Sequence, residues 1–104
     1  MISGKPADIP MTLDLSEEDK TPYFLWDEPT TVRQLRERLS SGDPKQWHYY
    51  AAKIMREARY DDVWRFLSLQ DVNRSWDSLR PILGRKKDLW EFLFSVWKRH
   101  GIVA

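Results

Sequence analysis

The chain of 104 residues contains no cysteine, only four glycines and only two histidines. Without cysteine there can be no disulfide framework, no zinc site with thiolate ligands and no catalysis by a thiol. No run of apolar residues approaches the roughly 18 that a membrane-spanning helix needs, and the first residues lack the basic and apolar stretches of a secretory signal. These absences predict a soluble, cytoplasmic protein.

The usual patterns of catalytic residues are also missing. The two histidines, His48 and His100, lie far apart in the sequence, and neither belongs to an HExxH motif. No serine stands in a GxSxG motif, and no glycine-rich loop is present to bind phosphate. We therefore expect no enzymatic activity, no metal site and no cofactor.

One acidic pair, Asp61–Asp62, has two interpretations. A catalytic acid–base pair needs two carboxylates that converge on one site, usually from different segments. Adjacent residues at the start of a helix instead point about 100° apart, and negative charge and a capping oxygen are both favourable there. We predict that Arg59 and Tyr60 end one helix and that Asp61 caps the next.

Charged residues and tryptophan are abundant in this chain. Seventeen lysines and arginines stand against sixteen acids, for a net charge of +1, and there are six tryptophans. Residues 1–21 combine prolines with the acidic cluster SEEDK, a composition typical of a flexible arm, although the alternating segment MTLDL allows a short extended piece. We predict a flexible acidic arm over residues 1–21 and a single helical domain over residues 22–104.

Capping and stop signals divide residues 22–104 into about five short helices. Gly42 and Gly101 stand where two of these helices are expected to stop. No Asn-Gly or Asp-Gly turn joins two alternating runs, so no β-hairpin is predicted. The predicted fold is all-α, a compact array of about five short helices preceded by the acidic arm. The start signals are Thr31-x-x-Gln34, Asp43 before Pro44, and Ser68-x-x-Asp71.

The last predicted helix, about residues 87–100, is unusually apolar. Its apolar side chains cover roughly 200° of the helix circumference. One core contact needs less than this, so the helix either packs on two sides or offers a second face to a partner. Trp26 lies elsewhere, in the aromatic segment PYFLWDEP, which its terminal prolines predict to be a loop. The predicted partner-binding anchors are Trp26, Trp90, Phe94 and Trp97.

Basic residues gather in two places, on one face of the second predicted helix and just before the last helix. Such clusters can bind phosphates, but an ordinary solvated face is the simpler interpretation. An acidic patch on another protein would explain the clusters as well as a nucleic acid would. The residues of this predicted basic face are Lys45, Lys53, Arg56, Arg59, Arg85, Lys86 and Lys87.

Three segments carry a family resemblance: PYFLWDEPTTVRQLRERLSSGD, AAKIMREARYDDVWRFLS and LWEFLFSVWKRHGI. Together they resemble a family of small, mostly uncharacterised bacterial proteins. The resemblance covers about residues 22–102 and leaves the acidic arm outside. The matching residues are mainly of packing and capping types: Pro22, Trp26, Asp27, Gly42, Arg56, Ala58, Asp62, Val63, Trp64 and Trp97.

Genes of this family often lie beside genes for nucleotidyltransferase-like toxins of the abortive-infection type. The resemblance therefore implies an antitoxin, or an accessory partner of such a toxin. We expect a non-enzymatic protein-interaction module. The alternative is a nucleic-acid-binding accessory protein that uses the basic face, and a weaker third possibility is a homodimer formed through the last helix.

Overall fold

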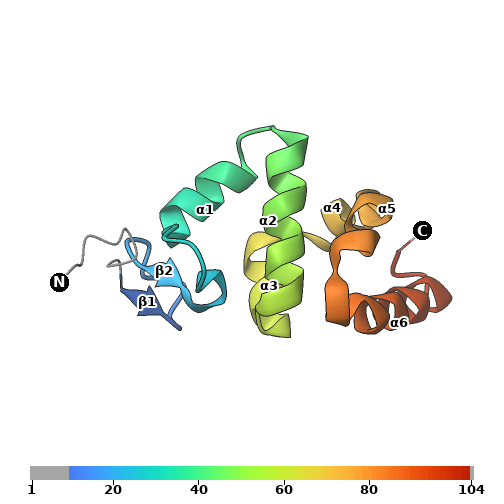
Figure 1. Cartoon of the computed structure of the whole chain (residues 1–104). Helices are drawn as coiled ribbons and strands as arrows, with labels where there is room; N and C mark the ends of the chain where they lie inside the picture. The colour runs from blue at the N-terminus through green and yellow to red at the C-terminus, as the bar shows by residue number, and fades with distance from the viewer. Residues whose placement is uncertain (1–9, 104) are drawn as a thin grey trace. The chain divides into compact units, whose positions relative to one another are not determined.

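The computed structural model describes residues 10–103 of the chain. These residues are mostly helical, which confirms the predicted all-α class, and they add one very short two-stranded sheet (Figure 1). The chain forms two compact units that divide between Tyr50 and Ala51. The predicted limits, an arm over 1–21 and one domain over 22–104, stay a prediction.

Over its described residues, 10–50, unit 1 contains two strands, a 3-10 helix, one complete α-helix and the first half of another. In chain order these are β1 (Met11–Thr12), β2 (Thr21–Pro22), η2 (Tyr23–Leu25), α1 (Val32–Leu39) and the beginning of α2 (Pro44–Glu57).

Unit 2 contains the end of α2 and a series of short helices. These are α3 (Tyr60–Phe66), α4 (Leu69–Arg74), α5 (Trp76–Leu79), the 3-10 helices η3 (Arg80–Ile82) and η4 (Gly84–Lys86), and α6 (Lys87–Arg99). Among residues 10–103, no helix combines the length and the apolar character that crossing a membrane requires.

The described part of the predicted arm is tied into unit 1. β1 and β2 pair in parallel, with Met11 opposite Thr21, and the Thr21 amide donates a hydrogen bond to the Pro10 carbonyl at 2.9 Å. Leu15, between the strands, is buried. Residues 10–21 are thus more closely held than their composition predicted, because strand pairing and one buried leucine offset their polarity. Residues 1–9 of the predicted arm lie outside the described residues.

The aromatic segment after β2 forms the 3-10 helix η2 rather than an irregular loop. A 3-10 helix needs only one short turn, so it fits between Pro22 and Pro29. Phe24 and Leu25 are buried, and Trp26, immediately after them, is exposed. Phe24 and Leu25 therefore hold the segment to unit 1, and the Trp26 side chain is left in solvent.

α1 and α2 begin as the sequence predicts. The Thr31 hydroxyl accepts a hydrogen bond from the Gln34 amide at 3.1 Å, and the Gln34 side chain accepts one from the Thr31 amide at 2.9 Å. This is a complete capping box. At α2, the Asp43 carboxylate accepts from the Lys45 amide at 3.0 Å, and Pro44 occupies the first helical position.

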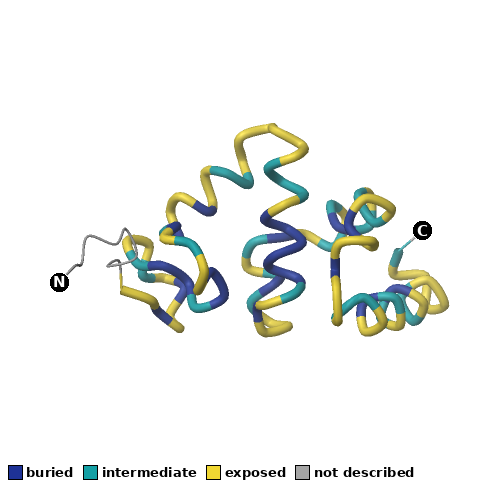
Figure 2. Tube along the Cα trace, in the orientation of Figure 1, coloured by how far each residue is buried: buried dark blue, intermediate teal, exposed yellow. Residues whose placement is uncertain are grey.

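The middle of α2 is buried, as the dark segment of its trace shows (Figure 2). Tyr50, Ala51 and Ile54 follow one another at helical spacing, which predicts a shared apolar face, and all three lie in the core. Lys53 was predicted on the exposed basic side of this helix, but it is only 5% exposed. The basic side of α2 is therefore narrower than predicted.

The junction between α2 and α3 corrects one prediction. α2 ends at Glu57, and α3 begins at Tyr60 with Arg59 as its N-cap and no side-chain capping bond. Asp61 and Asp62 lie inside the first turn, so neither is the predicted cap. They still occupy the end of the helix where the dipole favours negative charge.

α4 keeps its predicted start, because the Ser68 hydroxyl accepts from the Asp71 amide at 3.1 Å. The helix breaks at Ser75, and α5 and η3 follow, with Pro81 inside η3. The start signal at Ser68 and the stop at Pro81 predict one helix over this region, but the structure has two α-helices and a 3-10 turn.

α6 ends at Arg99, and the predicted stop residue, Gly101, follows the C-cap His100 with a φ of +72°. The Ile102 amide donates to the Trp97 carbonyl at 2.8 Å, and the Gly101 amide donates to the Lys98 carbonyl at 3.1 Å. These two bonds make up a Schellman motif, in which glycine supplies the left-handed residue. The core of unit 2 lies against α6 and contains Val63, Leu67, Val72, Leu79, Leu83, Trp90 and Phe94.

Candidate functional site

The wide apolar surface of α6 consists of two stripes at helical spacing. One stripe carries Trp90, Phe94 and Trp97. The other carries Leu89, Phe92, Leu93 and Val96, at positions i, i+3, i+4 and i+7. The first stripe is directed into unit 2. We call the second the outer stripe of α6.

Trp90 anchors α6 in the core of unit 2. The residue is 2% exposed, and its indole nitrogen donates a hydrogen bond to the Met55 carbonyl at 3.0 Å. The ring also stacks with Tyr60, with centroids 6.0 Å apart, and meets Trp64 edge to face at 5.9 Å. Its polar edge and both of its neighbouring rings are therefore used inside the unit.

Phe94 continues the same aromatic cluster. It is also 2% exposed, stacks on Trp76 with centroids 4.4 Å apart, and meets the half-buried Trp97 at 5.0 Å. Because Trp90 and Phe94 are buried, they cannot present their rings to a partner, and the anchor role predicted for them is corrected. The anchors were predicted from the size of their aromatic side chains, but burial decides which of these side chains can contact a partner.

The outer stripe of α6 is exposed in part, which favours the second of the two alternatives that the sequence left open for this helix. Phe92 is 61% exposed and Leu89 is 48% exposed, while Leu93 and Val96 beside them are half-buried. The apolar spacing i, i+3, i+4 and i+7 was the sequence signal that could have identified these four residues. A stripe of this kind matches the way an amphipathic helix packs on a partner surface.

Trp26 is the most exposed of the predicted anchors, at 67%. It lines a small hollow of unit 1, about 120 Å³ in volume, together with Met11, Thr21 and Leu25 and with the segment 27–29. The hydroxyl oxygen of Thr21 is buried and has no hydrogen-bond partner among the described residues. Trp26 thus remains available for contact.

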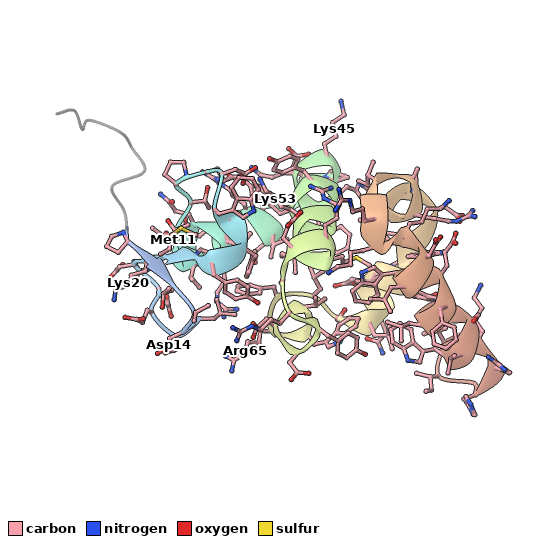
Figure 3. All side chains as sticks on the ribbon, turned by 60° about the horizontal axis from the view of Figure 1, so that its bottom comes forward. Met11, Asp14, Lys20, Lys45, Lys53 and Arg65 are labelled. Atoms are coloured by element: carbon pink, nitrogen blue, oxygen red, sulfur yellow. The ribbon has the colours of Figure 1, made fainter. Side chains whose placement is uncertain are left out.

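The predicted basic residues do not form one face. Lys45, in unit 1, is exposed and extends away from α2 (Figure 3). Lys53 is buried, Arg59 is exposed at the start of α3, and Lys87 lines a separate hollow with Asp77, Arg80 and Pro81.

Three of the basic residues come together in unit 2. Arg56, from the last turn of α2, and Arg85 and Lys86, from η4, line one hollow of about 400 Å³. Glu57 and the buried Leu83 complete its lining. The structure therefore joins residues that are about thirty positions apart, which charge patterning alone cannot do; we call this the basic hollow.

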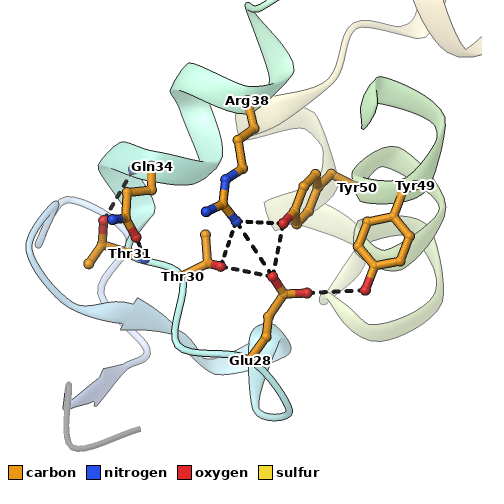
Figure 4. A network of polar contacts seen from close by, with 7 residues as sticks. All are labelled: Glu28, Thr30, Thr31, Gln34, Arg38, Tyr49 and Tyr50. Atoms are coloured by element: carbon orange, nitrogen blue, oxygen red, sulfur yellow. Dashed lines mark hydrogen bonds and ion pairs between the residues drawn. The ribbon is translucent and has the colours of Figure 1, made fainter. Parts of the chain in front are cut away.

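A polar network holds unit 1 together around Glu28 (Figure 4). One carboxylate oxygen of Glu28 accepts hydrogen bonds from Thr30 at 2.8 Å and from Tyr50 at 2.9 Å. The other accepts from Tyr49 at 3.2 Å. The Arg38 guanidinium lies 3.6 Å from the same carboxylate and donates to the Tyr50 hydroxyl at 2.6 Å.

This network changes the acidity of one phenol. Burial raises the pKa of Tyr50, and the hydrogen bond to Glu28 raises it further, because an ionised phenol would face a carboxylate. The sequence offered no signal for the network, since nothing around Glu28, which lies between Asp27 and Pro29, indicates a contact with tyrosines about twenty positions later.

The acidic pair Asp61–Asp62, considered above as a possible catalytic pair, has a structural position. Asp62 forms an ion pair with Arg65 at 3.5 Å, one turn along α3. Within residues 10–103, no three side chains of histidine, cysteine or acidic type gather to hold a metal ion. The pair Asp61–Asp62 thus belongs to the start of a helix.

Comparisons of the chain with protein-family models, with curated proteins and with solved structures found no match.

Proposed function

We propose that this protein is a non-enzymatic interaction module that binds another protein through the outer stripe of α6. The observation that carries the proposal is the exposure of Phe92 and Leu89, the two residues of the outer stripe that lie outside the core of unit 2. Large apolar side chains gathered on one exposed face are typical of binding surfaces. Aromatic anchors at the centre of such surfaces contribute much of the binding energy.

The partner follows from the family resemblance rather than from the geometry. The resemblance favours a nucleotidyltransferase-like toxin, with this chain as its antitoxin or accessory protein. Exposed cations such as Lys45 and Arg59 would steer an acidic partner toward the module without contributing much affinity.

The test uses two matched single substitutions. Phe92→Ser removes an anchor that is 61% exposed, and Leu13→Ser removes an apolar side chain that is 63% exposed in unit 1. Both positions are open to solvent, so each variant should change the free energy of unfolding by about 0.5 kcal/mol or less.

The first measurement is the identity of the neighbouring gene, which the proposal expects to encode a nucleotidyltransferase-like protein. Affinity is then measured against that protein after co-expression and purification. We expect Phe92→Ser to weaken binding about thirtyfold or more, as loss of a central anchor does, and Leu13→Ser to leave it unchanged. Failure of the two proteins to co-purify would reject the toxin partner. Equal weakening by both substitutions would reject the outer stripe as the binding surface.

Light scattering of the isolated chain separates a foreign partner from a second copy. If the outer stripe instead forms a homodimer, the wild-type chain is dimeric and Phe92→Ser makes it monomeric. A monomeric wild-type chain is the result expected here.

A further inference from the structure

The basic hollow of unit 2 has a charge that the interaction surface does not explain. Its lining contains three cations, Arg56, Arg85 and Lys86, and one acid, Glu57. Three positive charges less one negative charge leave +2 around a single concave site. Like charges this close repel each other, so their convergence favours a bound anion of matching charge.

The walls of the basic hollow are held in place by two hydrogen bonds. The Arg56 guanidinium donates to the Ile82 carbonyl at 2.8 Å, just before η4. One residue earlier, the Met55 carbonyl accepts from the buried Trp90 indole of α6. The end of α2 is thus fastened on both sides of η4, to Ile82 before it and to Trp90 after it. A site in which one cation, Arg56, is already positioned loses less entropy when it binds than a fully mobile one.

Gly84 brings these two walls together. Its φ of +54° lies in the left-handed region, and a Cβ at this position would lie 3.7 Å from Cδ of Arg56. The arginine stem therefore runs alongside the glycine backbone. The turn at Gly84 places the next two residues, both cationic, on the same hollow as Arg56.

We propose that the basic hollow binds the phosphate group of a nucleotide-sized ligand. Arginine offers a planar fork of donors to phosphate oxygens, and lysine adds a point charge. A phosphate dianion matches the net charge of +2, whereas a single carboxylate matches half of it. The volume of about 400 Å³ falls within the roughly 300–1,000 Å³ of small-molecule sites.

The basic hollow and the outer stripe of α6 share no residue. Arg56, Arg85 and Lys86 form the first, and the second is centred on Leu89 and Phe92. Loss of phosphate binding and loss of protein binding can therefore be separated by substitution, and either proposal can fail alone.

The test is a titration with inorganic pyrophosphate at low salt, followed by calorimetry and by the amide signals of residues 56 and 84–86. The test variant is Arg85→Ala with Lys86→Ala. Its matched control is Lys98→Ala with Arg99→Ala, which removes two cations from the other end of α6. Both variants lower the net charge by two, and circular dichroism checks that each keeps its helices.

We expect the wild type and the control to bind pyrophosphate equally and the test variant to bind about tenfold more weakly or worse. Affinity should fall with added salt, because exposed cations are screened. Equal loss in both variants would show that net charge alone is responsible and would overturn the site. Absence of binding by the wild type at low salt would overturn it as well.

Two further ligands identify the source of the phosphate. Tighter binding of a mononucleotide than of pyrophosphate assigns the group to a free nucleotide. Tighter binding of a single-stranded oligonucleotide, with a steeper salt dependence, assigns it to a nucleic-acid strand. In either case the test variant must lose the extra affinity over pyrophosphate. Extra affinity that persists in this variant would contradict the proposal.

Discussion

Each of the two units of this small protein is stabilised internally by a different kind of interaction. Unit 1 is organised around a partly buried carboxylate, Glu28, that accepts bonds from Thr30, Tyr49 and Tyr50 and lies beside Arg38. Unit 2 is organised around a cluster of aromatic rings.

In unit 2 the rings make edge-to-face and stacked contacts at centroid distances of 4.4 to 6.1 Å: Tyr60, Trp64, Trp76, Trp90, Phe94 and Trp97. Stability in unit 1 should therefore respond to charge and protonation, whereas stability in unit 2 should respond to volume.

The largest effect is expected from Trp90→Ala. The substitution removes the buried ring and leaves the Met55 carbonyl without its donor, so it should lower the free energy of unfolding by about 3–5 kcal/mol. The midpoint of urea unfolding measures this. Trp90→Phe should recover part of the loss, because it restores the ring but not the hydrogen bond. A loss as small as that of a surface substitution would mean that the aromatic cluster does not hold unit 2.

Glu28→Gln should come second. The amide keeps the shape of the side chain but loses the charge that Arg38 and the two tyrosines contact, which should cost about 1–3 kcal/mol. Urea unfolding again supplies the measurement. Glu18→Gln is the control, since Glu18 is an exposed acid paired with Arg33 at 3.6 Å, and such pairs contribute less than about 1 kcal/mol. Equal effects of the two substitutions would remove the distinction between network and surface.

The third prediction concerns alkaline pH. The pKa of Tyr50 is raised in the folded state, so the folded protein holds this proton more tightly than the unfolded chain does. The resulting stability is fully present below the ordinary tyrosine pKa of about 10 and is lost as pH rises through the raised value.

Unfolding midpoints across this alkaline range should therefore fall more steeply for the wild type than for Tyr50→Phe. Trp90→Phe, in the aromatic unit, should instead run parallel to the wild type. Parallel curves for all three proteins would show that the phenol is not linked to folding.

The smallest effect is expected from Asp61→Ala. Asp61 lies in the first turn of α3 but makes no capping bond, so only the interaction with the helix dipole is lost, about 0.3–1 kcal/mol. Thr31→Ala, which removes a full capping box in α1, should cost about 1 kcal/mol or more. Calorimetric melting of the two variants compares them, and a larger loss for Asp61→Ala would restore Asp61 as the cap.

Local signals predicted much of this fold. The capping box at Thr31, the start at Asp43 and Pro44, and the stop at Gly101 all depend on residues within a few positions of each other. Short-range hydrogen bonds decide them, so the sequence carries enough information. The N-terminus of α3 was misplaced, because an acidic residue in the first turn and one at the cap look alike in sequence.

Long-range contacts were not predictable in this way. Nothing in the sequence indicated that Glu28 meets Tyr50, or that Arg56 shares a hollow with Arg85. The anchor prediction on α6 failed for Trp90 for the same reason. Both apolar stripes have helical spacing, and only the packing of unit 2 decides which one is buried.

The outer stripe of α6 also has a colloidal consequence. A net charge of +1 gives copies of this chain little long-range repulsion, so contact between exposed apolar side chains governs how they meet. The stripe around Phe92 should therefore set the concentration at which the isolated chain begins to associate. A protein partner that covers this helix would therefore be its binding target and would also keep the chain in solution.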